Sequence, residues 1–347
     1  VEQAIVNIHK RTKPEIIGIC STGVTETKGD DVEAFLRLIR QNHPDLADFP
    51  LVYVSTPDFK DAFQDGWEKT VTRMVEVLVE PSDEAARDAS RVNILPGCHL
   101  TPGDLDALRE IIEDFGLTPS FLPDLAGSLD GHIPDDFAPT TIGGIGVDEI
   151  ATMGRAAWTI AIGGQMKRAA DAMQKKAGVP YRLFERLSGL IPNDDFIGFL
   201  SDISGRAVPL KYRRQRSQLA DAMLDTHFHI GGRRVAIGAE PDLLFELSGL
   251  LYDMGATISA AVTTTHSPLL ERIETDEVIL GDLEDLEELA RDRACDLIIT
   301  HSHGRQAASR LGIPFHRAGF PMFDRLGAGH CVTVGYKGTR DLLFELA

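Results

Sequence analysis

Short apolar runs alternate with amphipathic segments along this chain, and the same pattern appears three times. In each copy an apolar run of strand length leads through a polar loop into a segment with apolar residues at helical spacing. A second apolar run then follows. The copies occupy residues 15–57, 91–124 and 233–264. Strand–helix–strand units of this kind predict parallel sheets with right-handed crossovers.

A second internal similarity joins residues 158–185 to residues 296–319, because both read strand, helix, then Gly-Val/Ile-Pro into a strand. We therefore predict an α/β fold with three Rossmann-like, doubly wound parallel-sheet domains, the first one partial. The acidic, helix-prone stretch 81–90 is the expected first boundary. The predicted division is 1–88, 89–206, a helical connection at 207–232, and 233–347.

Composition narrows the class of protein. The 347 residues are 43% hydrophobic with a mean hydropathy of -0.08, as in globular proteins. The net charge of -18 argues against a nucleic-acid surface. Membrane spans need about 18 unbroken apolar residues, which this sequence lacks. With no signal-peptide pattern either, we expect a cytoplasmic protein without membrane contact. The start at Val1, directly inside a helical pattern, suggests a mature or truncated fragment.

The cysteine pattern contains no local metal motif. Four cysteines are widely spaced, without a CxxC pair: Cys20, Cys98, Cys295 and Cys331. We expect them to be buried free thiols, since free cysteine is among the most buried residue types. The glycines at 143–146 and 163–164 lack the spacing of a dinucleotide loop and are predicted to be turn residues.

Histidines and arginines supply further candidates. His227 and His229 fall in a helix-like segment, where residues two apart diverge. His301 and His303 follow a strand, and a role in lining a pocket or a domain contact is favoured over metal binding. The basic run 211–216 is either a helix face that makes ion pairs or an anion or subunit contact. Acidic residues 282–288 are typical of a helix start.

One loop stands out as a binding surface. The apolar run 16–20 leads into Ser21, Thr22 and Gly23, and a helix is predicted to start near Asp30. A strand that ends in small polar residues before a helix places them at the carboxyl edge of a parallel sheet, where ligands bind. The residues alone give no complete catalytic set.

Long motifs then carry a specific resemblance. They read STGVTETKGDDV at 21–32, STPDFKDAFQDGWEKTV at 55–71, LTPGDLDALREIIEDFGLTPSFLPDLAGSLDGH at 100–132, RRQRSQLADAMLDTH at 213–227 and RAGFPMFDRLG at 317–327. The sequence resembles the nitrogenase component I superfamily, from Val1 to Ala347. Within it, the similarity is to the β-like subunits of the scaffold on which the iron–molybdenum cofactor is assembled.

The resemblance includes two departures from the catalytic β subunit. Gly23 stands where that subunit has a cysteine ligand of the eight-iron P-cluster, and Ala62 where it has a serine able to ligate the oxidised cluster. Neither side chain has a donor atom, so a P-cluster is not expected. The scaffold family instead implies a [4Fe-4S] cluster shared with a NifE-type partner, with this subunit's ligand cysteine upstream of Val1.

The resemblance also implies roles for the loop 20–27. Ser21, Thr22, Gly23 and Glu26 are expected to form the wall of the cluster pocket, with no catalytic residue and no metal ligand among them. None of the four cysteines falls at the family's ligand position.

The implied function is an assembly scaffold rather than a turnover enzyme, although members of the superfamily are oxidoreductases. The implied assembly is an α2β2 heterotetramer in which the NifE-type partner holds most of the iron–molybdenum cofactor precursor. NifB would supply that precursor, and the nitrogenase iron protein would dock during maturation. The alternative is a catalytic β-type subunit of nitrogenase or of dark protochlorophyllide reductase. A third hypothesis is a sugar- or nucleotide-linked α/β protein.

Overall fold

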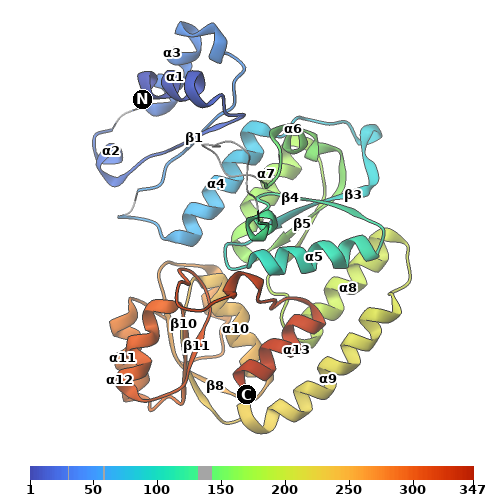
Figure 1. Ribbon diagram of the computed structural model, residues 1–347, viewed down its shortest axis with the longest axis vertical. Helices are drawn as coiled ribbons and strands as arrows, with labels where there is room; N and C mark the ends of the chain where they lie inside the picture. Colours follow the sequence, from blue (N-terminus) through green and yellow to red (C-terminus); the bar gives the residue numbers. More distant parts are fainter. Residues whose placement is uncertain (30, 58, 132–142) are drawn as a thin grey trace. The chain divides into compact units, whose positions relative to one another are not determined.

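The computed structural model describes residues 1–29, 31–57, 59–131 and 143–347, and it confirms the predicted α/β class (Figure 1). The described chain contains three sheets. It divides into two compact units. The first unit comprises Val1–Leu95, Ser120–Ile160 and Met166–Arg182, and the second comprises Pro96–Pro119, Ala161–Gln165 and Leu183–Ala347. The division into three domains at 88, 206 and 232 stays a prediction.

The first sheet is a parallel pair, β1 (Ile17–Cys20) and β2 (Leu51–Val54), in which Ile17 is opposite Leu51. Helices α1 (Glu2–Thr12) and α3 (Val32–Asn42) pack apolar side chains against it, and the shared core includes Ile5, Leu36 and Ile39. The side chain of Asp31 caps α3 by accepting a hydrogen bond from the Ala34 amide at 2.9 Å. Asp30, the predicted helix start, lies outside the described residues.

Three features of the first unit differ from or extend the sequence prediction. A short helix, α2 (Gly23–Thr27), occupies part of the predicted loop, and α4 (Phe63–Leu78) follows β2. The stretch 81–90 is mostly not helical: only Glu84–Ala86 form a 3-10 turn, and β3 already begins at Asp88. The Asp88 side chain accepts from the Ser90 amide at 2.9 Å, and a local bond of this kind competes with helix formation.

The second sheet has the order β4-β3-β5-β6. Its strands are β3 (Asp88–Pro96), β4 (Thr118–Phe121), β5 (Ala156–Ile162) and β6 (Tyr181–Phe184). Helices α6 (Val147–Thr152) and α7 (Lys167–Ala177) belong to the first unit, and α5 (Pro102–Asp114) belongs to the second. Gly116, two residues after α5, has a φ of 70°, a left-handed conformation that glycine adopts readily and that ends the helix.

The third sheet has the order β11-β10-β7-β8-β9, and all its neighbouring strands are parallel. Its strands are β7 (Arg234–Gly238), β8 (Thr257–Thr263), β9 (Ile279–Leu280), β10 (Leu297–Thr300) and β11 (Phe315–Arg317). Its direction of winding reverses between β7 and β10, as in a doubly wound domain. Buried small and branched residues such as Ala236, Ala260 and Ile298 let helices approach closely.

Helices account for the rest of the second unit. They are α8 (Leu190–Ser204), α9 (Leu210–Ile230), α10 (Pro241–Asp253), α11 (Leu283–Asp292), α12 (Arg305–Leu311) and α13 (Gly335–Leu346). Helix α9 lies within residues 207–232, where the sequence predicts a helical connection. The predicted acidic helix start at Asp282 is also confirmed, since its side chain accepts from the Glu284 amide at 2.7 Å.

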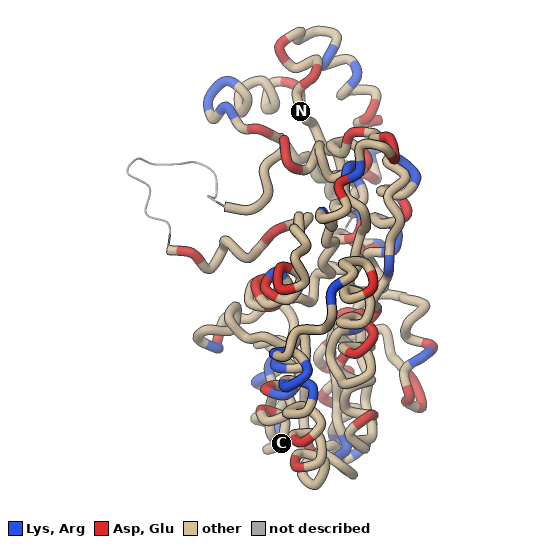
Figure 2. Tube along the Cα trace, turned by 90° about the vertical axis from the view of Figure 1, so that its right-hand side faces the viewer, with Lys and Arg blue, Asp and Glu red and all other residues tan. Residues whose placement is uncertain are grey.

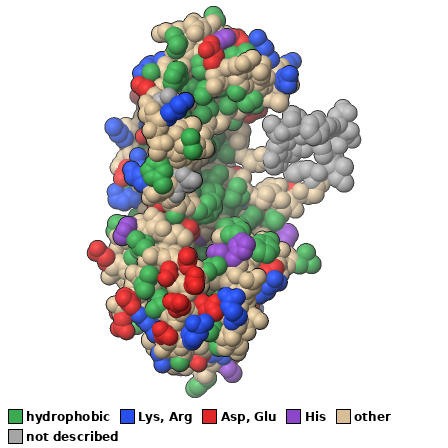
Figure 3. Space-filling view, turned by 90° about the vertical axis from the view of Figure 1, so that its left-hand side faces the viewer, with side chains coloured by type: hydrophobic (Ala, Val, Ile, Leu, Met, Phe, Trp, Pro, Cys, Tyr) green, Lys and Arg blue, Asp and Glu red, His purple; other side chains and the backbone are tan. Residues whose placement is uncertain are grey.

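Charged residues are distributed along the whole described chain, with basic residues interspersed among the acidic ones (Figure 2). On α11 and α12, acidic and basic side chains lie side by side (Figure 3), and Glu287 pairs with both Arg291 and Arg310. In the basic run 211–216, Lys211 pairs with Asp114 at 3.1 Å and Arg216 with Asp194 at 2.7 Å. These contacts support the ion-pair interpretation for those two residues. None of the helices described is long and apolar enough to span a membrane.

Candidate functional site

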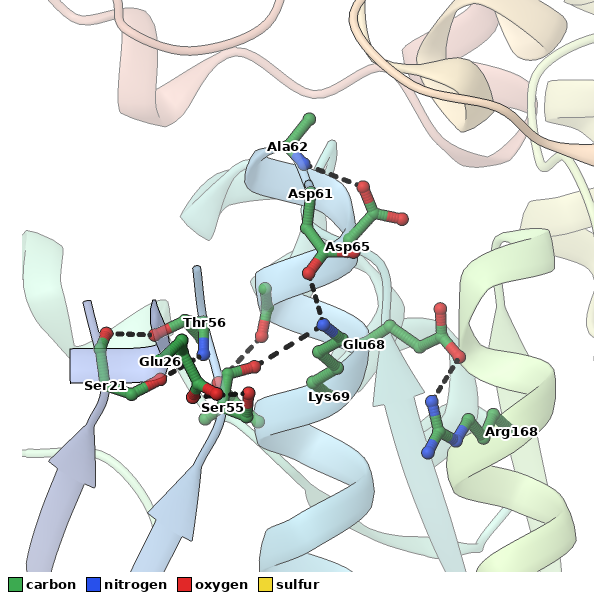
Figure 4. Close-up of polar contacts among 12 residues, drawn as sticks. Ser21, Glu26, Ser55, Thr56, Asp61, Ala62, Asp65, Glu68, Lys69 and Arg168 are labelled. Carbon is green, nitrogen blue, oxygen red and sulfur yellow. Dashed lines mark hydrogen bonds and ion pairs between the residues drawn. The ribbon is translucent and has the colours of Figure 1, made fainter. Parts of the chain in front are cut away.

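The predicted binding loop lies at the carboxyl end of β1, and a second polar loop follows β2 (Figure 4). Because the two strands are parallel neighbours, both loops emerge at the same edge of the sheet. The site therefore combines the predicted residues Ser21, Thr22, Gly23 and Glu26 with residues after β2.

Ser21 joins the two loops. Its hydroxyl oxygen accepts from the Thr56 amide at 2.9 Å, and its carbonyl accepts from the Thr56 hydroxyl, also at 2.9 Å. The Ser21 amide in turn donates to the Val54 carbonyl at 3.1 Å. These bonds continue the strand pairing beyond the ends of β1 and β2, so Ser21 is a structural junction with a buried side chain.

Thr22 and Gly23 begin helix α2. The Thr22 amide donates to the Thr25 hydroxyl oxygen at 2.8 Å, which satisfies a backbone donor at the helix start. Gly23 is buried as the first residue of the helix, whereas Val24 is 78% exposed. Helix α2 therefore exposes the apolar side chain of Val24, while its neighbour Gly23 has no side-chain atom that could ligate a metal.

Glu26 is the centre of the polar network. Its carboxylate accepts from the Ser55 hydroxyl at 2.7 Å and from the Tyr53 hydroxyl at 3.2 Å. Hydrogen bonding from the hydroxyl of Ser21, and then from that of Ser55, holds the pKa of Glu26 below its ordinary value. The side chain thus turns back onto β2 as an ionised acceptor and is already engaged, which suits a wall and not a metal ligand.

Lys69 extends the network to helix α4. Its ammonium group pairs with Asp61 and donates to the Ser55 carbonyl at 3.4 Å. Ala62 lies at the start of α4, and its amide donates to Asp65 at 2.8 Å. Further along the helix, Glu68 lies 3.9 Å from Arg168 of α7. The backbone around Ala62 is therefore held by the helix itself.

Sequence reasoning missed Tyr53, Ser55, Thr56 and Lys69 as parts of this site. A usable signal was present, because Ser55 and Thr56 follow an apolar strand as small polar residues, just as Ser21 and Thr22 do. Lys69 gave no such signal, since only the packing of α4 brings it to Ser55.

The chemistry of this site fits a pocket wall. An iron–sulfur cluster is ligated mainly by cysteine thiolates, and Ser21, Thr22, Gly23 and Glu26 provide none. Among the described residues no group of three or more His, Cys, Asp or Glu side chains could hold a metal ion. The loop can offer backbone amides, hydroxyls and one fixed negative charge to a cluster that is ligated by other residues.

The cysteine prediction is correct for two residues and wrong for two. Cys98 and Cys295 are buried, but Cys20 is exposed and Cys331 is half-buried. Cys20 is exposed because side chains alternate along β1, and Ile17 and Ile19 take the face that packs on the core.

The two histidine pairs and the turn glycines lie outside this polar network. His227 and His229 lie within α9, and His301 and His303 follow β10 with their rings 5.5 Å apart. His303 lines a cavity of about 780 Å³ with residues of α11 and α12, in agreement with the pocket-lining interpretation. Gly143, Gly144 and Gly163 have positive φ angles, as predicted for turn residues.

One prediction concerns the charge of Glu26. We expect Ser55→Ala to raise the pKa of Glu26 toward its ordinary value, because the 2.7 Å hydrogen bond to its ionised form is lost. Carboxyl carbon chemical shifts recorded against pH measure this change. Ser217→Ala, an exposed serine on α9, is the control, and an equal pKa in the Ser55 variant and the control would contradict the network.

Comparison with known proteins places the chain. The family model described as nitrogenase component 1 type oxidoreductase matches residues 1–347. A solved structure titled "Nitrogenase Cp1 at pH 6.5" superposes with a TM-score of 0.90 at 27% identity, over 99% of this chain and 77% of the other. The chain belongs to the nitrogenase component 1 family.

Curated relatives narrow the placement within that family. A protein from Bradyrhizobium diazoefficiens is 74% identical over the whole of this chain and 74% of its own length. Proteins from Mesorhizobium japonicum and a Nostoc species are 48% and 46% identical, over 75% and 77% of their lengths. All three are named nitrogenase iron-molybdenum cofactor biosynthesis protein NifN. With these identities over its full length, the chain groups with the NifN proteins.

Proposed function

We propose that this protein is a scaffold subunit for biosynthesis of the nitrogenase iron–molybdenum cofactor. The observation that carries the proposal is the 74% identity to a NifN protein over the whole chain. The site supports it, because Ser21, Thr22, Gly23 and Glu26 lie together at the carboxyl edge of the first sheet, where the wall of a cluster pocket would need them.

The wall limits which cluster this subunit supports. Gly23 and Ala62 have no donor atoms, and the backbone at both positions is held by helix starts. A P-cluster that needs ligands there does not form on this proposal. The chain instead contributes one side of a [4Fe-4S] pocket, whose thiolates come mainly from a NifE-type partner.

Exposed apolar side chains around the site support a partner on this surface. Val24 is 78% exposed, Phe59 65% and Phe63 50%, and all three lie on the loops or helices that carry the wall. Isolated exposed residues are ordinary, but three beside a polar network suit burial by another protein. The proposed assembly is an α2β2 heterotetramer that receives precursor from NifB and is docked by the nitrogenase iron protein.

Anaerobic co-expression of the full-length protein with its NifE-type partner tests the proposal. Iron and sulfide analysis and EPR of the purified complex are the measurements. We expect a heterotetramer with [4Fe-4S] signals and a larger precursor cluster. P-cluster-like signals would instead favour the alternative, a catalytic β-type subunit. A chain that forms no complex and binds no iron would contradict both functions.

The wall role has its own test in the same complex. We expect Glu26→Ala to make the reduction potential of the [4Fe-4S] cluster more positive, because removing a nearby negative charge favours the added electron. Thr22→Val is expected to change the cluster's potential or stability through the lost hydroxyl. Thr27→Val, an exposed change on the same helix, is the control. If both variants match the control in a redox titration, the wall role is wrong.

A further inference from the structure

A buried group of charged side chains lies within the second unit. His99 follows β3, and Asp242 and Glu246 occupy the first turns of α10. All three are buried, and His99 Nε2 lies 3.2 Å from a carboxylate oxygen of Glu246. The burial of charges costs free energy that must be offset by pairing and hydrogen bonds. Because apolar residues of similar size would avoid this cost, we look for a function that depends on the charges themselves.

The two carboxylates of this group hold turns from other elements. The carboxylate of Glu246 accepts from the amides of Leu187 and Ser188, at 3.0 and 2.7 Å, in the turn after β6. The carboxylate of Asp242 accepts from the Gln165 amide at 3.0 Å, in the turn after β5. With His99 in the turn after β3, three turns that follow strands meet at the start of one helix.

The packing at this centre is close. A Cβ atom at Gly97 would lie 2.7 Å from the His99 ring, and one at Gly163 would lie 2.6 Å from the Asp242 carboxylate. The two carboxylates and the imidazole are therefore in fixed mutual positions. His99 Nδ1 is buried without a hydrogen-bond partner, so the ring is held mainly by its charge interaction with Glu246.

The charge state of His99 follows from its neighbours. Burial disfavours the charged ring, but the Glu246 carboxylate outweighs burial, with Asp242 and Asp104 of α5 adding to it, so the pKa of His99 lies above its ordinary value. Burial disfavours the charged form of Glu246 too, yet pairing with His99 holds its pKa below its ordinary value. Burial raises the pKa of Asp242. Glu240, before α10, and the Cys98 thiol also face the centre.

We infer that His99, Asp242 and Glu246 form a proton-controlled latch, which ties the turns after β3, β5 and β6 to helix α10 and releases them when His99 loses its proton. The positive charge of the protonated His99 ring offsets the negative charge of the Glu246 carboxylate. The carboxylate can then stay buried and accept the hydrogen bonds from the Leu187 and Ser188 amides. Loss of that proton leaves a buried carboxylate without a counter-charge, which the fold can relieve only by admitting water to the turns.

The sign of the pH dependence follows from the two pKa shifts. A His whose pKa is raised by folding contributes stability that is complete below its unfolded value of about 6.5. That contribution is lost as pH rises through the higher folded value. The Glu246 contribution is lost in the opposite direction, as pH falls through its lowered pKa. The latch is closed between these limits and opens at alkaline pH.

Hydrogen exchange of the full-length protein at pH 6.5 and pH 9 tests the latch, after correction for intrinsic exchange rates. We expect the Gln165, Leu187 and Ser188 amides to lose at least about tenfold protection at pH 9, while amides of β7 keep theirs. In His99→Gln the same amides are expected to be equally weakly protected at both values. His229→Gln, an exposed change on α9, should behave as the wild type.

Two results would overturn the latch. One is wild-type protection of these amides that is equal at both pH values, and the other is a pH-dependent loss that persists in His99→Gln. If His99→Gln does not fold, Glu246→Gln decides, since it keeps a carbonyl acceptor for Leu187 and Ser188 but removes the charge. With no carboxylate left uncompensated when His99 is neutral, the alkaline loss of protection should disappear, and a loss as large as in the wild type would contradict the inference.

Discussion

Asp104→Ala is expected to destabilise the protein by about 3–5 kcal/mol. The carboxylate of Asp104 accepts from the Thr101 amide at 2.9 Å, from the Thr333 amide at 2.6 Å and from the Val334 amide at 3.2 Å. Asp104 is fully buried, so alanine would leave three amides without their acceptor. Each buried unsatisfied donor costs about 1–3 kcal/mol, and partial access to water limits the sum.

Urea unfolding followed by circular dichroism measures this loss, with Asp106→Ala as the matched control. Asp106 is an exposed carboxylate on the same helix, and its removal is expected to change the free energy of unfolding by less than about 0.5 kcal/mol. Asp104→Asn keeps one acceptor oxygen and should fall between the two. Equal unfolding free energies for Asp104→Ala and Asp106→Ala would show that the three amides find other partners.

Gly163→Ala is expected to cost about 2–5 kcal/mol, for two separate reasons. The backbone at Gly163 has a φ of 90°, which side chains rarely adopt. A Cβ there would also lie 2.6 Å from Asp242 Oδ2 and 2.9 Å from His99 Cε1. Both neighbours are buried and hold turns in place, so neither can move away without breaking its own interactions.

Gly232→Ala separates the two causes. Gly232 has a φ of 77°, but no atom lies within 4 Å of its added Cβ. It should therefore carry only the backbone cost of about 1–2 kcal/mol. The excess in Gly163→Ala, measured in the same urea titrations, then reports the close packing around His99. An equal decrease in the free energy of unfolding for the two variants would mean that His99 and Asp242 move to accommodate the new Cβ at no energetic cost.

The class of fold and the family could be read from the sequence because both depend on local patterns. Apolar runs of strand length and segments with apolar residues at helical spacing predicted β1, α3, β3, α5 and β7, and the structure confirms them. The collinear motifs between residues 21 and 327 carried the family resemblance. Helices α3, α4 and α5 each begin with a hydrogen bond between an aspartate side chain and a backbone amide three residues away, so their starts also depend on nearby residues.

Only the tertiary structure showed which distant residues meet. Lys69 reaches Ser55 through the packing of α4, and Asp104 accepts from residues more than 200 positions away. His99 meets Asp242 and Glu246 from two different strand–helix–strand copies, and no local pattern in either copy predicts that contact. Cys20 is exposed because of the face it takes on β1.

The sequence by itself determined the α/β class, the parallel crossovers, the NifN resemblance and the position of the loop Ser21–Gly23. These follow from hydrophobic periodicity and from motifs, which act over a few residues. The tertiary structure alone decided that Glu26 is engaged by Tyr53 and Ser55, and that buried charges tie three turns to α10. The physical reason is that hydrogen bonds and charge pairs depend on distances of about 3 Å, which the folding of distant segments sets.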